Sequence, residues 1–196
     1  MYRLAIVFTG HMIDLPGRDR PRFPARIEAL AEDVIKRVVG ARSAACDGDV
    51  VGIASGARGG DILFLEICRD LALDTRMVLP EPVEDFIAHS VDGVPSGEWV
   101  ARFQDLWNAH GAGEREVIGA DRSRPAVNIY DACNRRSLEL AGELAKEVRL
   151  LAYWNGEGGD GAGGTQSFVD LVEAAGGEVD RIDAGELLRR AAEAGI

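Results

Sequence analysis

The stretch VVGIASGARGGDILFLEICRDLAL, residues 50–73, is the strongest indication of the fold. It begins with an apolar run at 50–54, continues through a glycine-rich turn at 55–61, and ends in an apolar run at 62–73. A continuous short apolar run is typical of a strand buried on both faces of a parallel sheet. A strand, a glycine turn and a helix in this order form the unit of a doubly wound α/β fold.

A second unit of the same kind lies near the end of the chain. The predicted strand at 148–153 is followed by a loop at 154–165 with glycines at 156, 158, 159, 161, 163 and 164, and then by a helix from Gln166. Glycine lets backbone N–H groups approach an anion closely, and a helix N-terminus adds free donors and a partial positive charge. Two such turns at the carboxyl ends of strands predict a nucleotide-type pocket.

The rest of the chain continues the alternation of strands and helices. Strands are predicted at 4–8, 76–79 and 178–182, and helices at 26–39, 129–145, 165–175 and from 184 onward. The prediction is therefore one domain, 1–196, with a doubly wound, mostly parallel, Rossmann-like sheet and an inserted helical segment at 83–127. Aromatic residues stand four residues apart in that segment, at Trp99, Phe103 and Trp107. Core packing, a lid or a dimer surface would each explain them.

Composition limits the function. The formal net charge of −11 disfavours nucleic-acid binding, which depends on many Lys and Arg contacts to phosphates. The three cysteines and three histidines show no metal-ligand spacing, and the scattered cysteines predict a reducing compartment. No apolar run approaches a membrane span, and the opening segment does not resemble a signal peptide. We expect a cytoplasmic protein with no membrane contact, no metal and no bound cofactor.

Two motifs resemble those of a known group of domains. The turn Ser55-Gly56-Ala57-Arg58-Gly59-Gly60-Asp61 resembles the SGxARGxD stretch of DNA-processing protein A. Gly163-Gly164-Thr165 resembles the GGxGT turn of the Lonely Guy phosphoribohydrolases. These families define the SLOG (Smf/DprA–LOG) group of Rossmann-like domains, and the resemblance covers roughly 3–80 and 130–183. It implies binding of a nucleotide or nucleotide-derived signal, and several members of the group act in bacterial antiviral systems.

The predicted ligand lies where the turn after the first strand meets the two glycine loops. Arg58 and the backbone at 56–60 and 163–165 are expected to hold phosphate, whereas Arg135, Ser55 and Asn155 are expected to contact ribose or base. The full set of predicted ligand-binding residues is Thr9, Gly10, Ser55, Gly56, Arg58, Gly59, Gly60, Arg135, Asn155, Gly163, Gly164 and Thr165. Asp61 is interpreted first as a helix cap. The arginines at 18, 20 and 22 form either a surface loop or a basic rim over the site.

Two functions compete. The first is a module that binds a nucleotide-derived signal and acts through a homo-oligomer or a partner effector protein. The second is a nucleotide N-glycosidase that releases a free base, with Arg135 and Asp160 as catalytic residues. The resemblance to the hydrolases implies a glutamate just after the threonine, but Gln166 follows Thr165 here. Because an amide cannot act as a general base, the hydrolase would need Asp160, Asp131 or Asp170 in its place.

Overall fold

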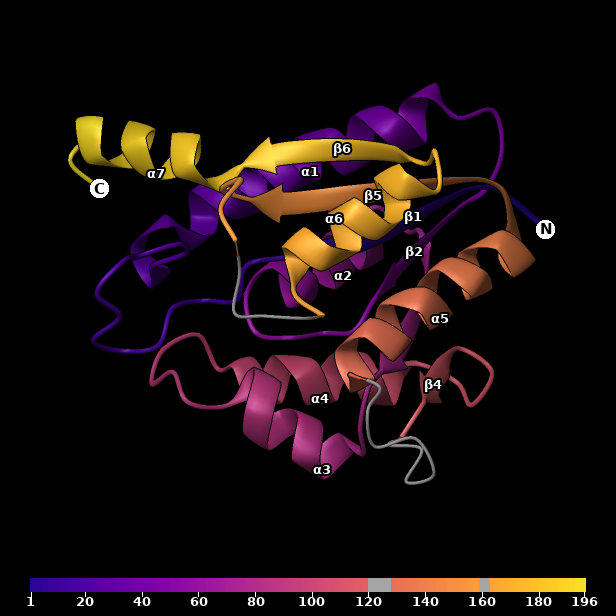
Figure 1. The fold of residues 1–196 in the computed structure, drawn as a ribbon, viewed down its shortest axis with the longest axis horizontal. Coiled ribbons are helices and arrows are strands. Elements are labelled where there is room, and N and C mark those ends of the chain that lie inside the picture. Colours follow the sequence, from indigo (N-terminus) through magenta and orange to yellow (C-terminus); the bar gives the residue numbers. More distant parts are fainter. Residues whose placement is uncertain (120–127, 159–162) are drawn as a thin grey trace.

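The protein forms a parallel β-sheet with helices on both faces (Figure 1). The computed structural model describes residues 1–119, 128–158 and 163–196. Within these residues the sheet has six strands in the order β4-β3-β2-β1-β5-β6, and every strand pair is parallel. The strands are β1 (Tyr2–Gly10), β2 (Val50–Ala54), β3 (Asp74–Leu79), β4 (Arg115–Val117), β5 (Ala145–Trp154) and β6 (Glu178–Asp183).

Alternate residues of the central strands pack into two separate cores. Leu4, Ile6 and Phe8 of β1 face one core, whereas Ala5 and Val7 face the other. The first core is covered by α1 (Glu28–Ala45), α2 (Gly60–Asp70), α4 (Trp99–Ala109) and α7 (Ala184–Glu193). The second is covered by α5 (Ile129–Leu144) and α6 (Thr165–Ala174), which lie together on one side of the sheet in Figure 1. This two-sided burial explains the continuous apolar runs of the strands.

The chain order creates a switch point beside β1. From β1 the chain builds the sheet outward through β2, β3 and β4, and then α5 carries it back to β5 on the other side of β1. In open α/β sheets the connections diverge at such a point and leave a crevice at the carboxyl ends of the strands. The turn after β1 and the loop after β5 therefore meet at the same place.

The segment at 83–127 is not wholly helical. It contains α3 (Val83–Phe86), a π-helical turn η2 (Ile87–Val91) and α4, but it also adds the edge strand β4, which sequence pattern did not reveal. The 3₁₀ turn η1 (Ala25–Ile27) precedes α1. Strand and helix boundaries elsewhere differ from the predictions by a few residues, and β2 matches its predicted bounds.

Aromatic residues of α4 pack inside the protein. Trp99 and Phe103 are buried, and the Phe103 ring stacks on Trp107 with centroids 6.1 Å apart. The guanidinium of Arg102 lies 4.1 Å from the centroid of the Trp99 ring and forms ion pairs with Glu28 of α1 and Glu66 of α2. For Trp99 and Phe103 the interpretation as core packing is confirmed.

Candidate functional site

A cavity of about 380 Å³ opens at the carboxyl ends of the strands beside the switch point. Its walls come from the turn after β1, the turn after β2, the start of α5, the start of α6 and the η2 turn. Six residues of the predicted site line it: Thr9, Gly10, Ser55, Gly163, Gly164 and Thr165. This volume is within the range of small-molecule sites in proteins.

The N-terminus of α6 forms one end of the cavity. Gly164 is its N-cap residue and provides no side-chain hydrogen bond, so the first-turn amides keep their partial positive charge toward the cavity. The Thr9 hydroxyl donates to the Thr165 hydroxyl at 3.3 Å, which joins the end of β1 to the start of α6. The Asn134 side chain of α5 donates to the Gly163 carbonyl at 3.2 Å. The predicted convergence of the first turn and the second glycine loop is therefore observed.

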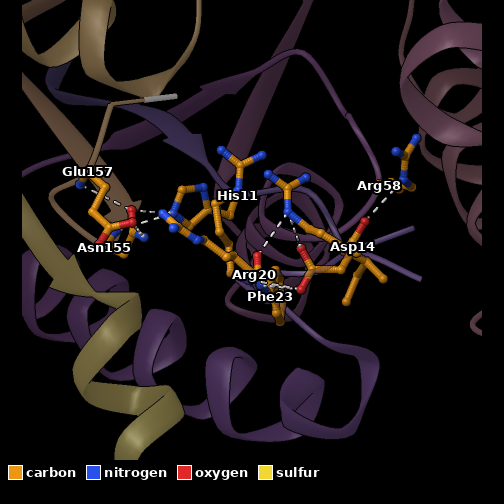
Figure 2. A network of polar contacts seen from close by, with 10 residues as sticks. His11, Asp14, Arg20, Phe23, Arg58, Asn155 and Glu157 are labelled. Atoms are coloured by element: carbon orange, nitrogen blue, oxygen red, sulfur yellow. Dashed lines mark hydrogen bonds and ion pairs between the residues drawn. The ribbon is translucent and has the colours of Figure 1, made fainter. Parts of the chain in front are cut away.

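The loop after β1 brings a guanidinium to the cavity. Asp14 closes this loop, because its Oδ2 accepts hydrogen bonds from the backbone N–H groups of Arg22 and Phe23 at 2.9 Å each (Figure 2). Arg22 lines the cavity, whereas Arg18 and Arg20 do not. Arg18 and Arg20 are exposed, as the surface-loop interpretation predicts, and Arg22 is the arginine of this loop that lines the cavity.

The glycine turn after β2 uses its own amides internally. The buried Asp61 carboxylate accepts hydrogen bonds from the N–H groups of Gly56 at 3.2 Å and Ala57 at 3.4 Å. The N–H of Arg58 donates to the Ser90 carbonyl, and that of Gly60 donates to the His11 carbonyl. Four of the five backbone donors at 56–60 that were expected to hold phosphate thus already have acceptors. Burial raises the pKa of Asp61 to about 6, since the backbone bonds offset only part of the lost hydration.

Arg58 connects loops and does not line the cavity. Its side chain is buried and donates from Nε to the Ile13 carbonyl at 3.3 Å and from Nη1 to the Asp92 carbonyl at 3.0 Å. Burial lowers the pKa of this guanidinium. Gly59 pairs with Met12 in an isolated bridge, and a Cβ at Gly59 would lie 2.5 Å from the Ile13 backbone nitrogen. Gly60 also lies close to the His11 carbonyl, whereas Gly56 packs against the side chains of Met77 and Phe103. Close packing therefore accounts for Arg58 and the glycines at 56, 59 and 60, none of which lines the cavity.

Replacing Arg58 with alanine is expected to lower the free energy of unfolding by about 2 kcal/mol, because the buried carbonyl of Ile13 and the carbonyl of Asp92 lose a charged donor. Urea denaturation measures this change. The control is Arg69→Ala, which removes an exposed ion pair to Asp105 and should change stability by less than about 1 kcal/mol. Equal effects of the two variants would contradict the loop-connecting role of Arg58.

One face of α5 turns toward the cavity, and Arg135 is not on it. Tyr130, Cys133, Asn134 and Ser137 line the cavity at helical spacing. Arg135 is exposed on another face of the helix, so it does not meet the cavity. Its predicted contact with ribose or base is thus not supported by this geometry.

The structure does not place at the cavity either of the described carboxylates that were predicted to replace the glutamate after Thr165. Asp131 and Asp170 do not line the cavity, and Asp170 accepts a hydrogen bond from the Gln166 side chain at 2.6 Å. Asp160 lies outside the described residues. Asn155 does not line the cavity. Its Oδ1 lies 3.1 Å from Nε2 of His11, and His11 does line the cavity (Figure 2). Asp61 is the carboxylate that the described part of the chain brings to the cavity wall.

The π-helical turn adds polar groups that sequence analysis did not find. His89 lines the cavity, and its Nδ1 lies 3.1 Å from Oε1 and 3.2 Å from Oε2 of Glu81. Burial and the neighbouring Glu81 carboxylate raise the pKa of the Tyr130 phenol. These residues belong to no motif and become neighbours only through folding, so no local signal marked them.

Cys133 lines the cavity as a protonated thiol. Its Sγ lies 3.6 Å from the Ser55 hydroxyl and donates to the Val78 carbonyl at 3.2 Å. Burial raises the pKa of this thiol to about 12, so it is not a nucleophile at neutral pH.

Comparison with known proteins gives no assignment. No protein-family model, no curated protein and no solved structure matches this chain. Across residues 1–119, 128–158 and 163–196, no three His, Cys, Asp or Glu side chains gather as a metal site. In the same residues no helix combines the length and apolar character needed to cross a membrane. The function must be argued from the cavity itself.

Proposed function

We propose that this protein binds a nucleotide or a nucleotide-derived signal in the cavity beside β1. The observation that carries the proposal is that the N-terminus of α6 and Arg22 both line this one cavity. Backbone amides at a helix N-terminus and a guanidinium are the groups that recognise phosphate. In a chain of net charge −11, the presence of both groups in the lining of one cavity favours a ligand with an anionic group.

The remaining walls suit a planar ring and a sugar. Phe86, Tyr130, Trp154 and Phe168 line the cavity and provide aromatic and apolar surface. Small polar side chains stand among them, including Ser55 and Asn134. A lining that combines apolar surface with polar side chains can both bury a ring and orient a small molecule.

The first test is calorimetric titration with the four common ribonucleoside 5′-monophosphates, comparing the native protein with Arg22→Gln. Loss of a charge-assisted hydrogen bond of about 1.5–3 kcal/mol should weaken binding roughly tenfold to a hundredfold. The backbone N–H of Arg22 that bonds Asp14 is kept in this variant. Arg20→Gln, an exposed change in the same loop, is the matched control and should bind like the native protein. Unchanged affinity in Arg22→Gln would contradict the proposed anion end.

A second candidate function is hydrolysis of the N-glycosidic bond of the bound nucleotide. The observation that favours it is the Asp61 carboxylate at the cavity wall, whose raised pKa of about 6 suits proton transfer near neutral pH. In that reaction the oxygen of water bonds to the anomeric carbon, the carbon–nitrogen bond breaks, and the base leaves with a proton. Mass spectrometry of the protein incubated with ribonucleotides and NAD distinguishes the two functions, because free base forms only in the second.

A further inference from the structure

Asp61 and the N-terminus of α6 lie on opposite sides of the turn after β1. Gly60, which precedes Asp61, donates its N–H to the His11 carbonyl of this turn, and Thr165 accepts from Thr9 on the other side. Asp61 follows β2 in the chain, and α6 follows β5. These two strands flank β1, so they are about 10 Å apart. The cavity thus has an anion-binding end at α6 and a carboxylate at the side of β2.

The Asp61 carboxylate keeps capacity for one more donor. A carboxylate offers about four acceptor positions. The backbone N–H groups of Ser55, Gly56 and Ala57 bond to it, and these bonds fix its orientation. The carboxylate also lines the cavity, so a ligand hydroxyl can supply the remaining hydrogen bond.

We propose that Asp61 selects the sugar of the ligand by accepting a ribose hydroxyl and by excluding a phosphate at that position. This inference rests on the proposed nucleotide binding. It assigns the orientation of the ligand in the cavity, with its single phosphate at α6 and its free hydroxyls at Asp61. An ionised carboxylate accepts from a hydroxyl but repels a phosphate, and burial strengthens that repulsion. In dinucleotide-binding folds an acidic residue recognises the ribose 2′-hydroxyl in the same way, and an arginine accommodates a 2′-phosphate.

The same geometry explains why the glycine turn after β2 does not bind the phosphate. Any anion that approached the amides of Gly56 and Ala57 would have to displace a carboxylate that is covalently part of the chain. Asp61 therefore fills the position of an anion and presents its own charge to the cavity. The turn becomes part of the sugar site, and α6 keeps the phosphate.

The test compares affinities for three probes by calorimetry at pH 8, above the Asp61 pKa of about 6. The probes are the 5′-monophosphate that binds most tightly, and the 2′,5′- and 3′,5′-bisphosphates of the same nucleoside. The native protein should bind the monophosphate at least tenfold more tightly than one or both of the bisphosphates. Asp61→Asn keeps the side-chain shape and removes the charge, so this ratio should fall to near one.

The control is Asp105→Asn, which removes the same charge from an exposed position on α4 outside the cavity and should keep the native ratio. Equal affinity of the native protein for the monophosphate and both bisphosphates would overturn the role of Asp61, and that comparison needs no variant. A native ratio that persists in folded Asp61→Asn would overturn it as well. Absence of binding by every 5′-monophosphate would instead contradict the proposed function on which this inference rests.

Discussion

Replacing Gly163 with alanine is expected to lower the free energy of unfolding by about 3 kcal/mol and to weaken binding of a 5′-monophosphate at least tenfold. Gly163 has a φ of +86°, which L side chains rarely adopt, and this strain costs about 1 kcal/mol or more. The new Cβ would lie 2.4 Å from the Tyr130 Cβ and 2.9 Å from the Asn128 Oδ1. Such overpacking adds about 1–3 kcal/mol.

The binding loss has a separate cause. Gly163 joins the loop after β5 to α6, and its contact with Tyr130 and Asn128 fixes how closely α6 approaches α5. A side chain at Gly163 would push these helices apart and shift the N-terminal amides of α6 away from the phosphate. A displacement of this kind weakens a site whose donors are held by the backbone.

Gly158→Ala is the matched control for this prediction. It lies in the same loop and has no positive φ, and among the residues that the structure describes no atom lies within 4 Å of a Cβ at this position, so the change should leave stability and affinity nearly unchanged. Urea denaturation and calorimetric titration measure the two effects. If both alanine variants behaved alike, the close approach of α5 and α6 at Gly163 would not be what positions the site.

The second large effect concerns the pH dependence of stability. The pKa of Asp61 is raised from 3.8 to about 6 in the folded protein, so the native state holds its proton more tightly than the unfolded chain. Ionisation of this buried carboxyl therefore destabilises the native state above pH 6 by about 3 kcal/mol. As the pH falls from 7.5 to 4.5, protonation relieves most of this penalty, and the contribution of Asp61 to stability rises.

The measurement is the free energy of unfolding of the native protein and Asp61→Asn between pH 4.5 and 7.5. Other carboxylates titrate alike in both proteins, so subtracting the two curves isolates Asp61. The difference should shift in favour of the native protein toward low pH, by about 2 kcal/mol over this window. A constant difference would show that Asp61 titrates normally in the folded state, and its burial would then need another explanation.

Much of the candidate site follows from turns that the sequence marks. Thr9 and Gly10 end β1, and Gly163 to Thr165 open α6, so their meeting at one sheet edge follows from the alternation of strands and helices. The role of Arg58 could not be predicted in this way. A guanidinium in a glycine turn has the same local pattern whether it faces a ligand or the carbonyls of Ile13 and Asp92.

The cavity also contains residues that no local pattern connects. Arg22 reaches it because Asp14 closes a loop across eight positions, and His89 reaches it on a π-helical turn beside Glu81. Arg135 and Asn134 are adjacent in sequence, yet only Asn134 lines the cavity. The rotation of α5 decides between them, and packing of Cys133 and Ala141 against the sheet sets that rotation.

The α/β class and the parallel sheet could be predicted from the sequence, because two-sided burial of the strands is visible in apolar runs such as 4–8 and 50–54. The edge of the sheet at which the site lies could be predicted as well, since glycine turns follow β2 and β5. The folded structure shows, in addition, that the turn after β2 uses its own polar groups internally. Asp61 accepts hydrogen bonds from Gly56 and Ala57 within that turn, whereas Arg58 donates to Ile13 and Asp92 in two other loops. A local sequence pattern does not reveal these partners, because the contacts of Arg58 with the other loops form only when the chain folds.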